Sequence, residues 1–254
     1  MKLKAKLVAI QVVHIVVLIM FQIFNKLNTN NYRINAFHLK IIAIVAMTIN
    51  HAGYIFSDRF NPLWWEATYL TVGKITFPVM AFLLVEGYKH TRDKWKYLLR
   101  MLLYALLAIY PFHFALRSNQ DLYLFNNVLF TLAVGLLMLM AIDKWGKLKY
   151  LFVVAASIIT LFSDWGISGT LIIYLMSLKN RKEFWALFSL LFPIVYFFQT
   201  NRWMDLTYLG LIFTVPLFYL YDGTKGYSSK WMKHAFYLYY PLHLLVLKLI
   251  SLII

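Results

Sequence analysis

The chain has 254 residues, of which 62% are hydrophobic and only 14% are charged. An average soluble domain has about 25% charged residues, so a water-soluble fold is excluded and one integral membrane domain over residues 1–254 is predicted. The formal net charge of +15 comes from basic residues in short runs between apolar segments. That arrangement favours a lipid bilayer as partner and argues against nucleic acid. The chain has no cysteine, which excludes disulfides and thiolate sites, and no metal is expected.

The apolar segments follow one another closely along the chain. Since lipid offers backbone groups no hydrogen-bonding partner, each segment must be helical. The fold class is therefore all-α, a polytopic transmembrane bundle of about ten spans. The first segment starts with lysines, as a signal peptide does, but its length of about 20 residues favours a retained span. The segments lie near residues 5–24, 37–56, 68–88, 95–116, 122–142, 148–163, 166–178, 183–199, 204–221 and 232–252.

Most of the 25 Lys and Arg residues fall in the loops after the odd-numbered spans. Lys and Arg of short loops prefer the cytoplasmic side, so these loops are placed inside and both termini outside. Lys2, Lys4 and Lys6 fall on the opposite side. The expected location is the bacterial cytoplasmic membrane, in a multi-pass arrangement.

Two histidines lie inside apolar spans. His51 follows Asn50 near the outer end of the second span, and His243 lies near the middle of the last one. A neutral imidazole can take a proton from an amine or hydroxyl, which makes His51 a candidate general base. For both histidines the alternative is a structural side chain that is hydrogen-bonded to a neighbouring helix.

Further polar residues gather on the predicted outer side. Lys74 lies in the third span, where it could neutralise a developing negative charge or extend its side chain back to the interface. Asp164 opens the short segment at 166–178, and Asn126 and Asn127 open the fifth span. With His51, these residues predict an outer site, with Asn126 and Asn127 as substrate contacts.

The predicted inner side carries a second group of charges. Glu86, Lys89 and Arg92 lie at the inner end of the third span, and Arg100 lies one turn into the fourth. Arg and Lys could bind the phosphates of a nucleotide-like donor, with Glu86 pairing with Lys89 or His90. The alternative reading is an ordinary positively charged membrane boundary.

Six short stretches of the chain form an ordered set of motifs. They are LKIIAIVAMTINH at 39–51, VGKITFPVMAF at 72–82, EGYKHTR at 86–92, NVLFTL at 127–132, DWGISG at 164–169 and FYLYYPLHL at 236–244. In this order they resemble the TraX family, the F-pilin acetylase type of membrane protein, over a core of about residues 37–250. The resemblance implies acetyl transfer from acetyl-CoA to an acceptor, with pilin's N-terminal amine as acceptor in the founding case. It further implies that His51 is catalytic, that His243 supports it, and that Lys89, Arg92 and Arg100 meet the CoA phosphates.

The chain departs from the family pattern at two positions. Asn50 stands where the family usually has Asp, and Lys74 stands where it usually has Arg. Asn can orient an imidazole by hydrogen bonding but cannot stabilise an imidazolium by charge, and Lys lacks the fork geometry of Arg.

Three functions are compatible with these features. The leading one is a membrane acetyltransferase acting on an amine or hydroxyl acceptor, either a pilin-like protein in conjugation or an envelope glycan. The alternative is a transporter or flippase of a small anionic or lipid-linked substrate, which would use the same charges without covalent chemistry. The third is a non-catalytic subunit of a pilus assembly machine. The transferase hypothesis predicts a polar cavity through the bundle. His51 would lie on its outer part, and basic residues would lie at its inner mouth.

Overall fold

The computed structural model describes residues 33–118, 122, 125–200 and 202–253. Within this part of the chain the structure is helical, and the pairing of Ile34 with Tyr221 is an isolated bridge rather than a strand. The elements are α2 (Ala36–Ile55), α3 (Leu63–His90), α4 (Lys94–Leu107), α5 (Ile109–Leu116), α6 (Val128–Lys144), η1 (Gly146–Leu148), α7 (Lys149–Ile159), α8 (Gly166–Ser177), α9 (Arg181–Thr200), η2 (Trp203–Phe213), α10 (Thr214–Leu220) and α11 (Lys230–Ile253).

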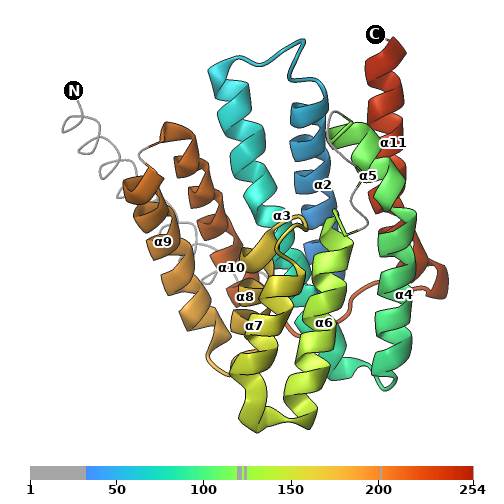
Figure 1. The fold of residues 1–254 in the computed structure, drawn as a ribbon, viewed down its shortest axis with the longest axis vertical. Coiled ribbons are helices and arrows are strands. Elements are labelled where there is room, and N and C mark those ends of the chain that lie inside the picture. The colour runs from blue at the N-terminus through green and yellow to red at the C-terminus, as the bar shows by residue number, and fades with distance from the viewer. Residues whose placement is uncertain (1–32, 119–121, 123–124, 201, 254) are drawn as a thin grey trace.

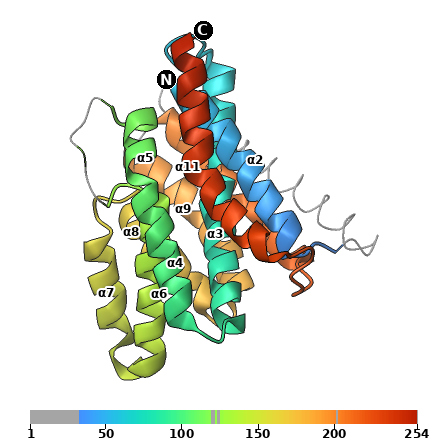
Figure 2. The same cartoon turned by 90° about the vertical axis from the view of Figure 1, so that its right-hand side faces the viewer.

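Helix α3 lies at the centre of the bundle. It packs against α2, α8 and η2, and α6 joins α4, α7 and α8 around it. Figures 1 and 2 show the long helices running roughly along one axis, with α11 beside α2 and α5. Side chains of α2, α3, α6 and α11 therefore face a common interior, where the polar residues described below gather.

Small residues allow α2 and α3 to approach closely. A Cβ atom on Gly53 would lie 2.1 Å from the ring of Tyr69, and one on Gly73 would lie 2.2 Å from the Asn50 amide. Glycines of this kind let membrane helices bring their backbones together, where van der Waals packing replaces the missing hydrophobic effect. The contact fixes the outer half of α2, which carries Asn50 and His51, against α3.

The predicted fourth span is broken into α4 and α5, which meet at an angle of 41°. Pro111 explains the position of the break, because its missing N–H leaves the carbonyl of Leu107, the last residue of α4, without an intrahelical partner. The same Tyr-Pro-x-His sequence recurs at 240–243, within the unbroken helix α11. Helices α5 and α11 pack against each other.

The expected number of about ten spans needs correction. Among the described residues, four helices are long and apolar enough to cross a membrane, namely α2, α3, α9 and α11, and the bent α4–α5 pair makes a fifth. The other segments from residue 122 onward are helical but short. Helix α7 has 11 residues and α8 has 12, or about 16 to 18 Å at 1.5 Å per residue, against a hydrocarbon core of about 30 Å. The span expected near 5–24 lies outside the described residues.

Candidate functional site

Two cavities lie in the interior of the bundle. The outer cavity, of about 220 Å³, is lined by the ends of α2, α3 and α6 that face the α7–α8 turn. The inner cavity, of about 330 Å³, lies toward the opposite ends of α2 and α3 and reaches the loop before α11. Met47 and Tyr240 line both cavities. These two side chains therefore form the partition between the outer and the inner cavity.

The predicted catalytic residues converge at the outer cavity. Asn50, His51, Lys74 and Asp164 line it, although they come from α2, α3 and the α7–α8 turn. His243 of α11 does not line this cavity but contacts His51, since Nδ1 of His51 lies 2.7 Å from Nε2 of His243. Both imidazoles are buried, with 8% and 6% of their surfaces exposed.

The hydrogen bonds of the two histidines determine where their protons sit. Nδ1 of His243 lies 2.8 Å from the backbone carbonyl of Tyr239, which can only accept, so this nitrogen must carry a hydrogen. In the neutral ring, Nε2 of His243 is then an acceptor and receives the hydrogen of His51 Nδ1. The lone pair of His51 is therefore left on Nε2. His51 therefore has a ring nitrogen that can accept a proton, and its other nitrogen is held by His243.

Lys74 points toward aromatic rings of the outer cavity. Its ammonium lies 3.9 Å from the ring centre of Tyr208 and 5.6 Å from that of Trp165. Both distances are in the range in which a cation is attracted to an aromatic face. Lys74 was expected either to act as a positive charge inside the bundle or to extend back to the interface. Its place in the lining of the cavity agrees with the first alternative. The neighbouring Asn50 donates to the backbone carbonyl of Tyr69, 2.9 Å away, and so braces α2 against α3.

Asp164 is held by the turn between α7 and α8. The next residue, Trp165, has φ of 66°, in the left-handed region that non-glycine residues seldom adopt, and its N–H donates to the Asp164 carboxylate at 3.1 Å. The hydroxyl of Thr131 donates to the Asp164 backbone carbonyl at 2.6 Å. The strained turn thus presents a carboxylate to the outer cavity instead of to solvent.

Asn126 and Asn127 lie at the start of α6 and do not line the outer cavity. Asn127 is the N-cap of α6: its side chain accepts from the N–H groups of Leu129 and Phe130 and donates to the carbonyl of Ala105. Nδ2 of Asn126 is buried and makes no hydrogen bond with a described residue. The geometry gives Asn127 a structural role in fixing the first turn of α6.

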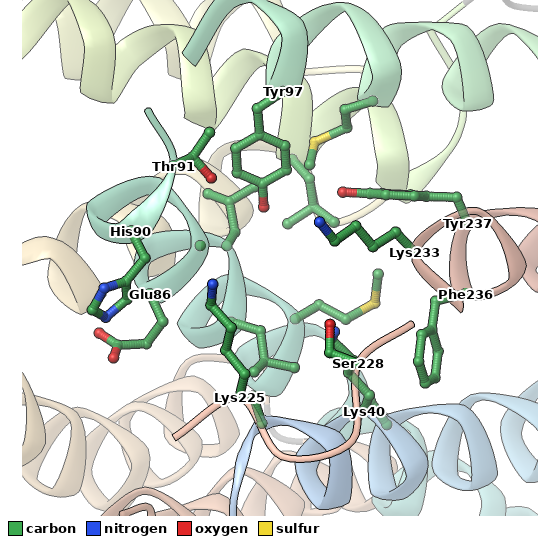
Figure 3. Close-up of a pocket in the computed structure, with 18 of the residues that line it drawn as sticks. Lys40, Glu86, His90, Thr91, Tyr97, Lys225, Ser228, Lys233, Phe236 and Tyr237 are labelled. Carbon is green, nitrogen blue, oxygen red and sulfur yellow. The ribbon is translucent and has the colours of Figure 1, made fainter. Parts of the chain in front are cut away.

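The inner cavity is lined by basic side chains. Figure 3 shows the ammonium groups of Lys225 and Lys233 directed into its open centre, with the hydroxyl of Tyr97 opposite them. Lys40 and Arg100 also line it. Nε of Arg100 is buried without a hydrogen-bond partner, while its guanidinium lies 5.6 Å from the ring of Tyr97. An unpartnered charged donor beside several lysines suits an anionic ligand.

Glu86 lines the inner cavity but is neutralised by other residues. Its carboxylate lies 2.7 Å from Arg181 of α9 and 3.5 Å from Lys89. Lys89 and Arg92 are exposed and lie outside the cavity lining. The ion pair between Glu86 and Arg181 leaves the cavity with an excess of positive charge.

The loop between α10 and α11 carries Lys225. Asp222 accepts hydrogen bonds of 2.8 Å from the N–H and from the hydroxyl of Thr224, and these bonds hold the pKa of its carboxyl below the usual value. Gly226 has φ of 63°, and a Cβ there would lie 2.3 Å from Asn35, the N-cap of α2. The loop is therefore fixed against the start of α2, with Lys225 at the cavity mouth.

Sequence reasoning missed several residues of the inner cavity. Lys40, Lys225 and Lys233 counted only as positive charges of inner loops, and Arg181 was not connected with Glu86. In the sequence, Tyr240 appears only as one residue of the family-like stretch at 236–244. In an apolar helix a tyrosine gives no distinguishing signal, because it is common both in cores and at interfaces.

The fold and site define a helical membrane protein with two internal cavities and a buried histidine pair beside one of them. The chain belongs to the TraX family, whose model, described as TraX protein, matches residues 36–251. It is similar to a probable fimbrial assembly protein, FimC of serogroup H1, from Dichelobacter nodosus. The two are 33% identical over 239 residues, which cover 86% of this chain and 96% of the relative. No solved structure shows significant similarity.

Proposed function

We propose that this protein is a membrane-embedded acetyltransferase, which moves an acetyl group from acetyl-CoA to an amine or hydroxyl acceptor. The observation that carries the proposal is the free Nε2 lone pair of His51, fixed by the bonds through His243 to the Tyr239 carbonyl. A base of this kind beside a polar cavity can activate an acceptor for attack on a thioester.

The basic lining of the inner cavity supports acetyl-CoA as the donor. CoA is a polyanion with a long, mostly neutral arm that ends in the thioester. Lys40, Lys225, Lys233 and Arg100 would hold its phosphates, and the less polar part of the cavity toward Met47 would take the arm. The acetyl group would then reach the partition that separates the inner cavity from His51.

The outer cavity, which His51 lines, is the proposed place of the acceptor. An amine or hydroxyl hydrogen-bonded to Nε2 of His51 gives up its proton as its lone pair attacks the thioester carbon. The carbon–sulfur bond then breaks, and the imidazolium returns the proton to the leaving thiolate, so that His51 ends as it began. Asp164 and Lys74 would orient the acceptor and balance charge around it.

The relative from Dichelobacter nodosus carries a name that refers to fimbrial assembly. We infer a pilin-like protein as acceptor, with an envelope glycan as the other class that offers a suitable amine or hydroxyl. Both would be modified at the bacterial cytoplasmic membrane, with CoA arriving from the cytoplasm. The inner cavity would then face the cytoplasm, as the distribution of Lys and Arg predicts.

The test uses the full chain in nanodiscs with acetyl-CoA labelled in the acetyl group. Binding of CoA and release of free CoA are followed with a panel of peptide amines and amino sugars as acceptors. Saturable CoA binding and label transferred to one acceptor class support the transferase. Failure to bind CoA would refute the proposal and favour the transporter, because the basic cavity would then serve another anion.

His243 is expected to act through its acceptor nitrogen. We expect His243→Ala to lower the transfer rate by about 10- to 100-fold, because Nδ1 of His51 loses its partner and the ring can adopt the other tautomer. His243→Gln retains a carbonyl oxygen that can accept from His51 and should recover part of the loss. Initial rates of CoA release at saturating acetyl-CoA measure both variants. Equal rates for the Ala and Gln variants would contradict the positioning role.

A further inference from the structure

Tyr240 occupies the boundary between the donor and acceptor sides. Its side chain is 2% exposed and lines both cavities. The ring centre lies 6.2 Å from that of His51 and 5.9 Å from that of His243. Tyr240 therefore lies at the boundary where a thioester from the inner cavity would meet an acceptor bound at His51.

The hydroxyl hydrogen of Tyr240 is not donated to any described residue. The hydroxyl is buried and makes no hydrogen bond of ordinary geometry with a described residue, although it faces the backbone N–H of Val128, the first residue of α6. That N–H can only donate, so it leaves the hydroxyl hydrogen of Tyr240 free. By contrast, the buried hydroxyl of Tyr104 has His234 as partner at 2.7 Å, and that of Tyr88 has Asp143 at 2.5 Å.

A buried hydroxyl without an acceptor costs stability, and a ligand atom that accepts its hydrogen would remove that cost. The chemistry of acyl transfer supplies such an atom. When the acceptor attacks, the carbonyl π electrons move onto the thioester oxygen, which becomes an oxyanion until the carbon–sulfur bond breaks. A fixed donor in a site shielded from water stabilises that charge more than it stabilises the neutral carbonyl.

We propose that Tyr240 is a catalytic residue whose hydroxyl donates a hydrogen bond to the thioester oxygen as it becomes an oxyanion. The proposal rests on the acetyltransferase function argued above. The cap formed by Asn127 holds the first turn of α6, and the packing of Tyr240 in the core fixes its ring. No proton is transferred at Tyr240: the hydroxyl keeps its hydrogen, and the carbonyl re-forms as the thiolate departs.

The test compares Tyr240→Phe with Tyr88→Phe, a control that removes a buried hydroxyl outside both cavities. Three measurements are made on the full chain in nanodiscs: CoA release with saturating acceptor, the affinity for CoA, and the affinity for the methylphosphonothioate ester of CoA. This ester is tetrahedral and anionic at the position of the carbonyl carbon, so it probes the oxyanion contact without needing an acceptor.

For Tyr240→Phe we expect kcat to fall about 100-fold, with KM for acetyl-CoA and affinity for CoA unchanged. The affinity for the phosphonothioate ester should fall by about 10- to 100-fold. Tyr88→Phe should leave all three quantities near the wild-type values. Unchanged CoA affinity shows that the variant is folded. If Tyr240→Phe retains wild-type kcat and ester affinity, the role of Tyr240 is overturned while the transferase stands. If the wild type binds neither CoA nor the ester, both proposals are overturned.

Discussion

Replacing His51 by alanine is expected to slow acetyl transfer by about 10²- to 10⁴-fold, the usual contribution of a general base. The lone pair of Nε2 is the only base that the hydrogen bonds of this histidine pair leave available, because both nitrogens of His243 are engaged. His51 lies on the far side of the partition from the basic cavity, so the affinity for CoA should stay unchanged. The loss should therefore appear in kcat, measured by release of CoA.

His113 provides a matched control. It has the same Tyr-Pro-x-His context as His243 but lies on α5 and lines neither cavity. His113→Ala should leave the rate within about twofold of the wild-type value, since surface and structural substitutions away from a site have small effects. A His51→Ala variant that transfers acetyl at the wild-type rate would remove the catalytic argument and leave the assembly role as the better account.

Reversing two charges at the inner cavity should weaken donor binding. For the double variant Lys225→Glu and Lys233→Glu, we expect KM for acetyl-CoA to rise by roughly 10- to 100-fold at low salt, with little change in kcat. Both side chains are directed into the cavity but are also exposed at its mouth, so solvent moderates each contribution. The difference should shrink as salt is added, because exposed charges are screened.

A control for this experiment makes the same change of charge elsewhere. Lys144→Glu and Lys147→Glu alter two lysines at the end of α6 and in η1, away from the cavity lining. A general effect of net charge would raise KM in both double variants. Equal values of KM in the two would show that the lysines of the cavity mouth do not bind the donor.

The outer site was predictable because polar groups in lipid are costly. His51, Lys74, Asp164 and His243 stand out in apolar segments, and the family resemblance added the supporting role of His243. The sequence could not show which of these side chains contact one another. Asn50 was expected to orient the imidazole, but its amide is bound to the Tyr69 carbonyl, and His243 contacts His51 from a residue 192 positions away.

The inner site was less predictable because a lysine at a membrane boundary has an ordinary explanation. Lys225 and Lys233 are no different in sequence from Lys89 and Arg92, yet only the first two point into the cavity. Their direction depends on how the loop before α11 folds back onto the start of α2. That contact joins residues far apart in the chain, and no local pattern encodes it.

The part of the chain that the structure describes has fewer long apolar helices than expected, for a related reason. Hydrophobicity identifies helices but does not measure how far each one reaches. Asp164 is the only charged residue between positions 150 and 177, but the turn at Trp165 divides this segment into two short helices. Tertiary contacts of Thr131 and Asp164 hold this turn in the bundle interior.

The hydrogen bonds of the histidine pair also have an energetic consequence for the membrane. The series from His51 through His243 ends at the backbone carbonyl of Tyr239, which accepts a hydrogen bond but cannot be protonated at neutral pH. A proton taken up at Nε2 therefore has no route onward through α11 and leaves from Nε2 again, in the proposed reaction to the thiolate of CoA. The pair thus offers protons no continuous path between the two compartments, because a proton passes Nε2 only when a bound acceptor delivers it and a leaving thiolate takes it.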